Sequence, residues 1–569
     1  MYTEKYQRWL ERADGDPDLF DELRSMDGND ELIRECFLRD LEFGTGGLRG
    51  VIGAGTDRLN IYTIGRATQG LAAYVNSTSG NGSVAVAYDS RIKSDLFART
   101  AARVLAANGI RVYIYRELMP TPMLSFAVRR LHCDAGIVIT ASHNPSKYNG
   151  YKVYGPDGCQ LGLEAAEYVL DIMNKVDIFD GVKYADYDEE VEKGNIRYIS
   201  DDVIEDYLCC VEKQRVEKNL DLSDLKVIYT PLHGTGNKPV RRILEKVGVK
   251  NVTVVPEQEL PDGNFPTAPY PNPEIRQAFE YALKLADSVK PDLLLATDPD
   301  CDRVGIAVRK DDEYVLMTGN EVGAMLLDYI AGRRSANGTL PRDPVAVKTI
   351  VTTDLAAKIA EKHGVKLIDV LTGFKFIGEQ IALLEKDGEE DRFIFGFEES
   401  YGYLAGSYVR DKDAVVASML ICEMAAYCKT CGITLLDYAA RLYDEHGYYL
   451  CSQKSFYCEG VSGMEQISGM MEKLRESHPT EINGISVVCV IDYLLSVSED
   501  KRTGERLALT LPKSNVLGFH LEDGSSVIVR PSGTEPKIKV YLSAVGSNRD
   551  ESAAKREGLE KAGSALLGF

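Results

Sequence analysis

The sequence has no long apolar run. No stretch approaches the roughly 18 consecutive apolar residues of a membrane-spanning helix. The N-terminus, Met1-Tyr-Thr-Glu-Lys-Tyr-Gln-Arg8, also lacks the apolar core of a signal peptide. We therefore expect a cytoplasmic protein.

Positive charge is in deficit. The chain has 66 Lys and Arg against 87 Asp and Glu, giving a formal net charge of −21. Nucleic acids and anionic membranes attract basic surfaces, so we expect neither as a general partner. Any bound phosphate must then be held by a local cluster of basic residues.

Paired cysteines are scarce. The 12 cysteines are scattered, mostly singly among apolar neighbours such as Val488-Cys489-Val490, which is typical of reduced core thiols. Cys428 and Cys431 have the spacing of a zinc or redox pair, but no second pair or nearby histidine pair completes a metal site.

The length of 569 residues indicates about three to four domains, and strand and helix signals alternate through most of it. A strand is expected at Val84–Tyr88, followed by a helix that Ser94 caps and Gly109 ends. The alternation recurs twice. Further strands are expected at 226–230, 252–255, 292–296, 345–350, 365–370 and 393–395. From about residue 448 the pattern changes to that of a smaller α+β domain closed by a helix.

Ser142 stands on a loop after the apolar run 135–140. With His143, Lys147 and Lys152 nearby, a serine at this place is suited to activation or to carrying a phosphate. The nucleophile elbow of serine hydrolases needs glycine two residues either side of the serine, where this chain has Thr140 and Asn144. Phosphoryl transfer is therefore favoured over acyl transfer.

Three carboxylates alternate in Asp298-Pro-Asp300-Cys-Asp302-Arg303, after another buried strand. Packing them together is costly unless a cation compensates, so a divalent ion is expected. An EF-hand loop would need Gly and Glu where Arg303 and Arg309 stand, which excludes that motif.

The segment Thr140-Ala-Ser-His-Asn-Pro145, with its continuation to Lys152, closely resembles the phosphoserine loop of the α-D-phosphohexomutases, the family of phosphoglucomutase and phosphomannomutase. The resemblance implies that Asp298, Asp300 and Asp302 hold Mg²⁺ together with a phosphate oxygen on Ser142. The residues to which it gives catalytic roles are Ser142, His143, Lys152, Arg49 and Lys412.

Other loops match the family's substrate-binding segments. Glu398 and Ser400 are similar to its sugar-binding residues, and Arg530-Pro-Ser-Gly-Thr-Glu-Pro-Lys537 is similar to its phosphate-binding loop. The residues implied to bind substrate are Thr372, Gly373, Phe374, Lys375, Glu398, Ser400, Arg303, Arg530, Ser532, Gly533 and Thr534.

The resemblance implies an α/β, four-domain phosphohexomutase fold, with three related α/β domains containing mixed sheets and a C-terminal α+β domain. The expected boundaries are a helical extension at 1–40, a phosphoserine domain at 41–200, a metal-loop domain at 201–320, a sugar-loop domain at 321–447 and a phosphate-loop domain at 448–569.

The implied reaction interconverts α-D-glucose 1-phosphate and glucose 6-phosphate through a phosphoserine and glucose 1,6-bisphosphate, which also serves as activator. Phosphopentomutase, phosphomannomutase and glucose-1,6-bisphosphate synthase activities remain alternatives within this class. An inactive sugar-phosphate-binding relative and a serine phosphohydrolase are more remote. The sequence leaves the preferred sugar, the general acid/base and the oligomeric state open.

Overall fold

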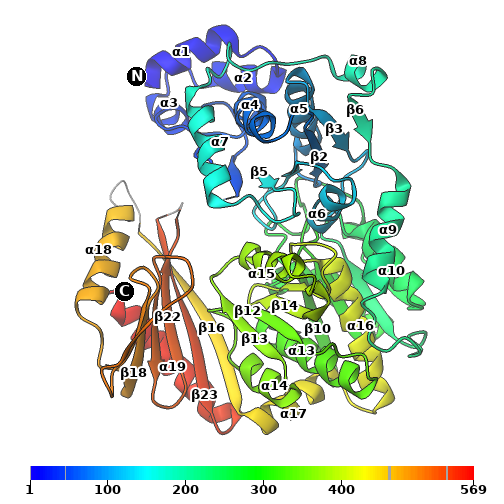
Figure 1. The fold of residues 1–569 in the computed structure, drawn as a ribbon, viewed down its shortest axis with the longest axis vertical. Coiled ribbons are helices and arrows are strands. Elements are labelled where there is room, and N and C mark those ends of the chain that lie inside the picture. The colour runs from blue at the N-terminus through cyan, green and yellow to red at the C-terminus, as the bar shows by residue number, and fades with distance from the viewer. Residues whose placement is uncertain (1, 45, 459–462, 534–535) are drawn as a thin grey trace. The chain divides into compact units, whose positions relative to one another are not determined.

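The computed structural model describes the chain except for residues 1, 45, 459–462 and 534–535. It divides into two compact units, the first made of residues 1–317, 377–393 and 400–431 and the second of residues 318–376, 394–399 and 432–569. Figure 1 labels the helices and strands of both units.

The N-terminal extension is helical. Its helices are α1 (Tyr2–Arg12), α2 (Pro17–Ser25) and α3 (Asp30–Phe37). They enclose Trp9, which is 1% exposed, and Trp9 packs edge-on against Tyr62 at the start of α4 (Ile61–Thr78). In Figure 1 the blue helices accordingly lie beside α4. The extension thus shares an apolar core with the domain that follows it.

A mixed six-stranded sheet forms that domain. Its order is β1 (Gly47–Val51), β5 (Tyr148–Tyr154), β4 (Ala135–Ile139), β2 (Ser83–Tyr88), β3 (Arg111–Ile114) and β6 (Ile196–Tyr198). β5 is antiparallel to both neighbours, whereas β4, β2, β3 and β6 run parallel. Its helices after α4 are α5 (Ser94–Ala107), α6 (Thr121–Arg130), α7 (Leu163–Lys175) and α8 (Tyr187–Glu192). Every residue of β4 is buried, because helices cover both faces of such a sheet.

The expected serine cap of α5 is wrong. The N-cap residue is Lys93, in the left-handed conformation with φ 61°, and it makes no side-chain cap hydrogen bond. The Ser94 hydroxyl instead donates to the buried carboxylate of Asp89 over 2.8 Å. Gly109, with φ 77°, follows the helix as expected, since glycine adopts positive φ without a steric cost.

The first unit also contains a second mixed sheet. Its order is β11 (Glu313–Met317), β10 (Val304–Lys310), β9 (Leu293–Thr297), β7 (Lys226–Thr230) and β8 (Asn251–Val254). The helices here are α9 (Asp201–Glu212), α10 (Asn237–Lys246), α11 (Pro256–Glu259), the 3₁₀ turn Arg276–Phe279 and α12 (Glu280–Val289). The first unit also contains β15 (Gly402–Leu404) and α16 (Ala414–Thr430).

The second unit begins with α13 (Gly319–Ala336) and has β13 (Lys366–Val370), β12 (Val345–Thr349) and β14 (Phe393–Glu398) in that order. α14 (Leu355–His363) and α17 (Leu435–His446) belong to the same unit, and α15 (Phe374–Lys386) and the 3₁₀ turn Glu390–Arg392 follow β13 along the chain. Thr318 and Glu321 form a capping box at the start of α13.

The C-terminal part of this unit is an eight-stranded sheet. Its order is β16 (Tyr448–Tyr457), β23 (Lys537–Gly546), β22 (Ser526–Pro531), β21 (Leu517–Leu521), β18 (Ile485–Asp492), β19 (Val497–Asp500) and β20 (Arg506–Ala508), with β17 (Glu481–Ile482) beside β18. α18 (Gly463–Glu476) and α19 (Arg549–Leu566) pack against its apolar face. This antiparallel arrangement is the α+β domain expected from the sequence.

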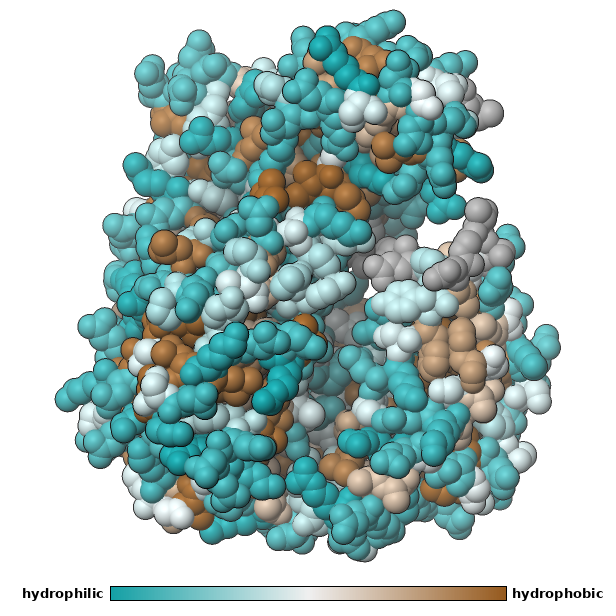
Figure 2. Space-filling model, turned by 180° about the vertical axis from the view of Figure 1, so that it is seen from behind, coloured by the Kyte–Doolittle hydropathy of each residue, from teal (hydrophilic) through white to brown (hydrophobic). Residues whose placement is uncertain are grey.

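Hydrophilic side chains cover most of the face shown in Figure 2, in keeping with the composition. Among the described residues, no single helix has the length and apolar composition needed to cross a membrane. In that described part of the chain, α16 and α17 meet the length and composition criterion when they are taken together as a broken pair.

Candidate active site

Ser142 lies just beyond the carboxyl end of β4 and is only 4% exposed. Its φ of 52° is in the left-handed region, where a non-glycine residue needs support from its surroundings. Part of that support is local, because the Ser142 N–H donates to Thr140 Oγ1 over 2.9 Å. The resulting turn directs Ser142 Oγ to Asp298 Oδ2, 2.8 Å away.

Arg91 supplies the rest of the support. Its side chain is fully buried, with Nε 3.3 Å from Asp89 Oδ2. Nη1 donates to the carbonyl oxygens of Pro145 and Tyr148 over 3.0 and 2.9 Å, and Nη2 donates to those of Ser142 and Asn144. One guanidinium therefore holds four carbonyls of the serine loop.

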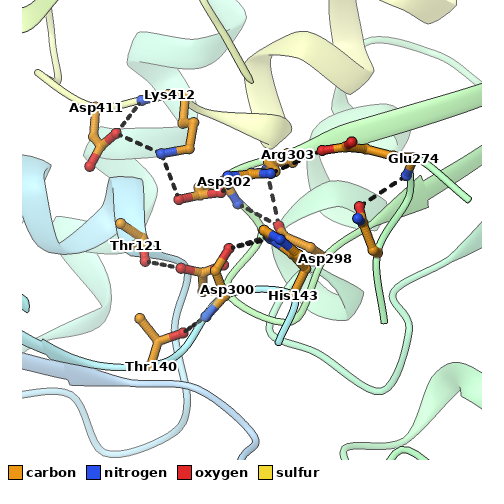
Figure 3. Close-up of polar contacts among 12 residues, drawn as sticks. Thr121, Thr140, His143, Glu274, Asp298, Asp300, Asp302, Arg303, Asp411 and Lys412 are labelled. Carbon is orange, nitrogen blue, oxygen red and sulfur yellow. Dashed lines mark hydrogen bonds and ion pairs between the residues drawn. The ribbon is translucent and has the colours of Figure 1, made fainter. Parts of the chain in front are cut away.

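The three aspartates follow β9, and their side chains are buried. Asp298 Oδ1 accepts hydrogen bonds from the backbone N–H groups of Asp302 and Arg303 over 3.1 and 3.0 Å, which closes the loop on itself. Each of Asp298, Asp300 and Asp302 offers one carboxylate oxygen, and these oxygens lie within 4.8 Å of one another. Figure 3 shows the three side chains pointing toward one another.

Two lysines lie beside the aspartates. Lys152 Nζ, from β5, lies 2.9 Å from Asp300 Oδ2 and 3.7 Å from Asp302 Oδ2. Lys412 Nζ lies 3.0 Å from Asp302 Oδ2 and 3.2 Å from Asp411 Oδ1 (Figure 3). The sequence-predicted lysines are therefore both in contact with the acidic loop.

The electrostatics of the aspartates fit a bound cation. Burial, and then repulsion from Asp300 and Asp302, raises the pKa of Asp298 well above its usual range. Burial raises the pKa of Asp302 as well. At Asp300 burial also acts to raise the pKa, but the charge and hydrogen bond of Lys152 outweigh it, so the pKa is lowered. Within the described part of the chain, Asp300 Oδ1 and Asp302 Oδ1 are buried and accept no hydrogen bond. Such hard oxygen donors fit a small divalent cation.

His143 lies beside the serine, and two arginines lie near His143. His143 Nδ1 lies 3.3 Å from Ser142 Oγ. Burial, aided by the charges of Arg303 and Arg49, holds the pKa of His143 well below its ordinary value, so its imidazole is neutral at pH 7. Arg49 lies on β1 opposite Gly150, and Arg303 Nη1 lies 3.1 Å from Glu274 Oε1. The first unit thus brings together all the predicted residues of the serine and metal loops.

The second unit holds most of the predicted substrate-binding residues. Glu398 ends β14 and is 6% exposed, and Arg530 lies on β22 opposite Lys539. The remaining residues described there are Thr372, Gly373, Phe374 and Lys375 after β13, and Ser532 and Gly533 after β22. Thr534 lies outside the described residues, and Ser400 belongs to the first unit.

Four consecutive domain descriptions match this chain. They are Phosphoglucomutase/phosphomannomutase alpha/beta/alpha domain I at residues 40–178, domain II at 205–311, domain III at 318–446, and the C-terminal domain at 475–557. The chain belongs to the phosphoglucomutase/phosphomannomutase family. It is an enzyme, a mutase that transfers phosphoryl groups, and the predicted four-domain α/β fold class is confirmed.

Relatives that match along most of their length support the same family assignment. A phosphoglucomutase of Staphylococcus aureus strain USA300 is 39% identical over 566 residues, covering 98% of each chain. One from Staphylococcus saprophyticus is 39% identical over 512 residues, covering 90% of this chain and 92% of its own.

Solved structures share the fold. The open form of the Paramecium exocytosis-sensitive phosphoprotein parafusin, a phosphoglucomutase, has a TM-score of 0.69 at 19% identity and covers 93% of this chain and 95% of its own. A phosphoglucomutase/phosphomannomutase family protein of Burkholderia thailandensis has a TM-score of 0.64 at 18% identity, covering 92% and 97%.

Four residues of this family site escaped the sequence analysis. Arg91 and Asp89 support the serine loop, Thr121 donates to Asp300 Oδ2 over 2.9 Å, and Asp411 contacts Lys412. A signal for the first two was available, because Asp89 and Arg91 directly follow β2 at the same sheet edge as Ser142. Thr121 and Asp411 carry no comparable signal.

Proposed function

We propose that this family member is a Mg²⁺-dependent phosphoglucomutase that interconverts α-D-glucose 1-phosphate and glucose 6-phosphate. The observation that carries the proposal is the 2.8 Å contact of Ser142 Oγ with the buried carboxylate of Asp298, inside a group of three aspartates. The phosphoglucomutase names of the Staphylococcus relatives support the choice of glucose.

In the proposed reaction, phosphoserine 142 gives its phosphoryl group to the free hydroxyl of the bound monophosphate. The bond from phosphorus to the serine oxygen breaks, a bond to the sugar oxygen forms, and the proton that the sugar hydroxyl loses ends on the Ser142 oxygen. The resulting glucose 1,6-bisphosphate reorients and returns its other phosphoryl group to Ser142. Free glucose 1,6-bisphosphate would act as activator by phosphorylating Ser142.

Asp298, Asp300 and Asp302, with the oxygen on Ser142, would hold Mg²⁺. When bound, the ion neutralises charge on the transferring phosphoryl group. Arg49 and Arg303 would contact the same group. Lys152 and Lys412, held by Asp300 and Asp302, would stabilise negative charge in the site, and Lys412 is the candidate acid/base. Neutral His143 would orient Ser142 Oγ.

Substrate recognition is assigned to the remaining loops. Glu398 and Ser400 would bind sugar hydroxyls, and the loop Thr372–Lys375 would distinguish sugars. Arg530, Ser532, Gly533 and Thr534 would hold the nonreacting phosphate through a guanidinium fork, hydroxyls and backbone N–H groups.

The domain boundaries would be those expected from the sequence, 1–40, 41–200, 201–320, 321–447 and 448–569. Because sugar phosphates do not cross membranes unaided, the enzyme would work in the cytoplasm.

A coupled assay with glucose, mannose and ribose 1-phosphates, activated by glucose 1,6-bisphosphate, tests the substrate. A mutase binds its ligand in two orientations, and the equatorial 3- and 4-hydroxyls of glucose look alike from both ends. A ribose ring cannot offer that pair, and each buried hydrogen-bonding group left unpaired costs about 1 to 3 kcal/mol. We expect kcat/KM for glucose to exceed that for ribose by roughly ten- to a hundredfold.

The Ser142→Ala variant is the control for mechanism. It should lose turnover and the phosphate that mass spectrometry finds on the Ser142 peptide of active enzyme. A preference for ribose 1-phosphate would make phosphopentomutase the function while leaving the Ser142 mechanism intact. Phosphate found only on other peptides would overturn that mechanism.

A further inference from the structure

Lys412 lies in a buried segment of the first unit. Residues 410–413 are between 0% and 7% exposed. Arg410 anchors the start of the segment, because its backbone N–H donates to Ser125 Oγ over 3.0 Å and its Nη2 donates to Glu385 Oε2 over 2.7 Å. The backbone beside Lys412 is therefore held in place. Its side chain is a flexible four-carbon chain, so the contacts of the ammonium must set its direction.

Asp411 supplies one of these contacts. Lys412 Nζ donates to Asp411 Oδ1 over 3.2 Å, and the backbone N–H of Lys412 donates to the same oxygen over 2.9 Å. The ammonium also lies 3.0 Å from Asp302 Oδ2. Figure 3 shows it between the two carboxylates. Of these two, only Asp411 lies outside the predicted metal loop.

The other oxygen of Asp411 is held by Tyr154, to which no role has been assigned above. Tyr154 is the last residue of β5, is 0% exposed and donates its hydroxyl to Asp411 Oδ2 over 2.6 Å. Gln160 Nε2 donates to the same oxygen over 3.3 Å. Both oxygens of the carboxylate are therefore engaged, one by the lysine and one by two donors, which restricts its rotation.

The strand β5 serves both lysines of the site. It is an interior strand, paired with β1 on one side and β4 on the other. Lys152 and Tyr154 are two positions apart on it, so their side chains leave the same face. Lys152 contacts Asp300 directly, with Nζ 2.9 Å from Oδ2, whereas Tyr154 reaches Lys412 through Asp411. One strand face thus places one lysine directly and the other through a carboxylate.

We propose that Tyr154 and Asp411 form a positioning pair that directs Lys412 Nζ to the reacting oxygens beside the metal loop. The proposal rests on the proposed function, because it takes Lys412 as the candidate acid/base. Such a group acts only within hydrogen-bond reach of the reacting oxygen. Its displacement weakens an interaction made in the transition state rather than substrate binding, so kcat should fall and KM should stay nearly unchanged.

The Tyr154→Phe variant keeps the ring and removes the hydroxyl. A displacement of a catalytic group by about 1 Å costs about a hundredfold in rate, but Gln160 still restrains the carboxylate in this variant. We therefore expect kcat to fall about tenfold and KM to change less than about twofold. Asp411→Asn removes the charge that holds the ammonium and should lower kcat about a hundredfold.

Tyr207→Phe is the matched control. Tyr207 is also 0% exposed, and its hydroxyl donates to another buried aspartate of the segment, Asp413, over 2.9 and 2.8 Å. Asp413 has a second donor in Tyr408, just as Asp411 has one in Gln160, but Asp413 caps α16. The control should therefore lose as much stability in urea unfolding as Tyr154→Phe and keep the wild-type kcat.

A double-mutant cycle separates positioning from general packing. Kinetics are measured on whichever of the glucose, mannose and ribose 1-phosphates the wild-type enzyme turns over fastest. In a Lys412→Gln background, Tyr154→Phe should add little further loss of kcat, because its effect acts through the ammonium. An unchanged kcat in Tyr154→Phe, an equal loss in Tyr207→Phe, or fully additive effects in the cycle would each overturn the proposal.

Crystal structures of the variants, grown with Mg²⁺, keep the test independent of turnover. Lys412 Nζ and the Asp411 carboxylate should be displaced in Tyr154→Phe and stay in place in Tyr207→Phe. If the wild-type protein proved inactive on all three sugars while this displacement was present, the proposed function would fail and the positioning role would stand. A Lys412 side chain that stayed in place in Tyr154→Phe would overturn the positioning role at any level of activity.

Discussion

Replacing Arg91 with lysine is expected to lower kcat by about a hundredfold while leaving the chain folded. Arginine has five N–H donors in a rigid fork, and Arg91 uses them on four carbonyls of residues 142–148. A lysine ammonium preserves the charge beside Asp89 but cannot bond both ends of the loop at once. A displacement of the reacting oxygen by about 1 Å is enough for a hundredfold loss.

The stability cost follows from the same contacts. At least two buried carbonyls lose their donor, and each unmade bond costs about 1 to 3 kcal/mol, so we expect about 2 to 6 kcal/mol of local destabilisation. Urea unfolding followed by circular dichroism measures this loss, and the coupled mutase assay measures kcat. The fraction of Ser142 that carries phosphate, from peptide mass spectrometry, reports directly on the loop.

Arg215→Lys is the matched control. Arg215 lies beside Glu423 and donates to the carbonyls of Glu217 and Leu220, so it makes the same kinds of contact at a place without catalytic residues. It should lose stability and retain kcat. Wild-type kcat and phosphorylation in Arg91→Lys would refute the reasoning, because the loop would then hold its geometry without the fork.

Three further outcomes are expected. Asp300→Asn should weaken the dependence of activity on added Mg²⁺ and lower kcat by on the order of a thousandfold or more. Chelator should stop the wild-type enzyme reversibly. Full activity of the wild-type enzyme in excess chelator would contradict this expectation. Trp9→Ala should destabilise the N-terminal extension by about 3 to 5 kcal/mol, measured by circular dichroism, with kcat in native buffer unchanged. Arg129, then Arg410, lowers the pKa of Glu385 from 4.5 to about 2. The pKa of Glu385 is lower in the folded than in the unfolded protein. The stabilisation of the folded state by this carboxylate is therefore complete above about pH 5 and is lost as the pH falls toward 2. The difference in urea midpoint between wild type and Glu385→Gln should shrink over that range.

The loops of the first unit could be predicted because their signals are local. A continuous apolar run predicts a strand buried on both faces, and polar residues directly after it predict a loop at the carboxyl edge. Ser142 and Asp298 both satisfy this description, and the structure brings their side chains to 2.8 Å. The same rule would have found Arg91, had it been applied to β2.

Other features depend on packing between distant parts of the chain. Thr121 and Asp300 are 179 positions apart, and no periodicity relates them. The cap of α5 shows a second reason. Serine is a favoured N-cap residue, but the Ser94 hydroxyl donates its hydrogen bond to the buried carboxylate of Asp89. Lys93 occupies the N-cap position instead. Tertiary hydrogen bonding overrode the local preference.

The charges around Ser142 explain why a divalent cation and two lysines belong to one site. A phosphoserine brings up to two negative charges next to three buried carboxylates. Four basic residues lie nearby. Lys152 and Lys412 contact the carboxylates, and the charges of Arg303 and Arg49 lower the pKa of His143. Asp411 and Glu274, which pair with Lys412 and Arg303, add further negative charge. The phosphorylated site is therefore negative, which would repel an incoming sugar phosphate. A divalent cation among the aspartates would offset that negative charge, and the buried oxygens of Asp300 and Asp302 that accept no hydrogen bond in the described part of the chain are where it would bind. A metal bound there would serve substrate capture as well as transfer, so its removal should raise KM together with lowering kcat.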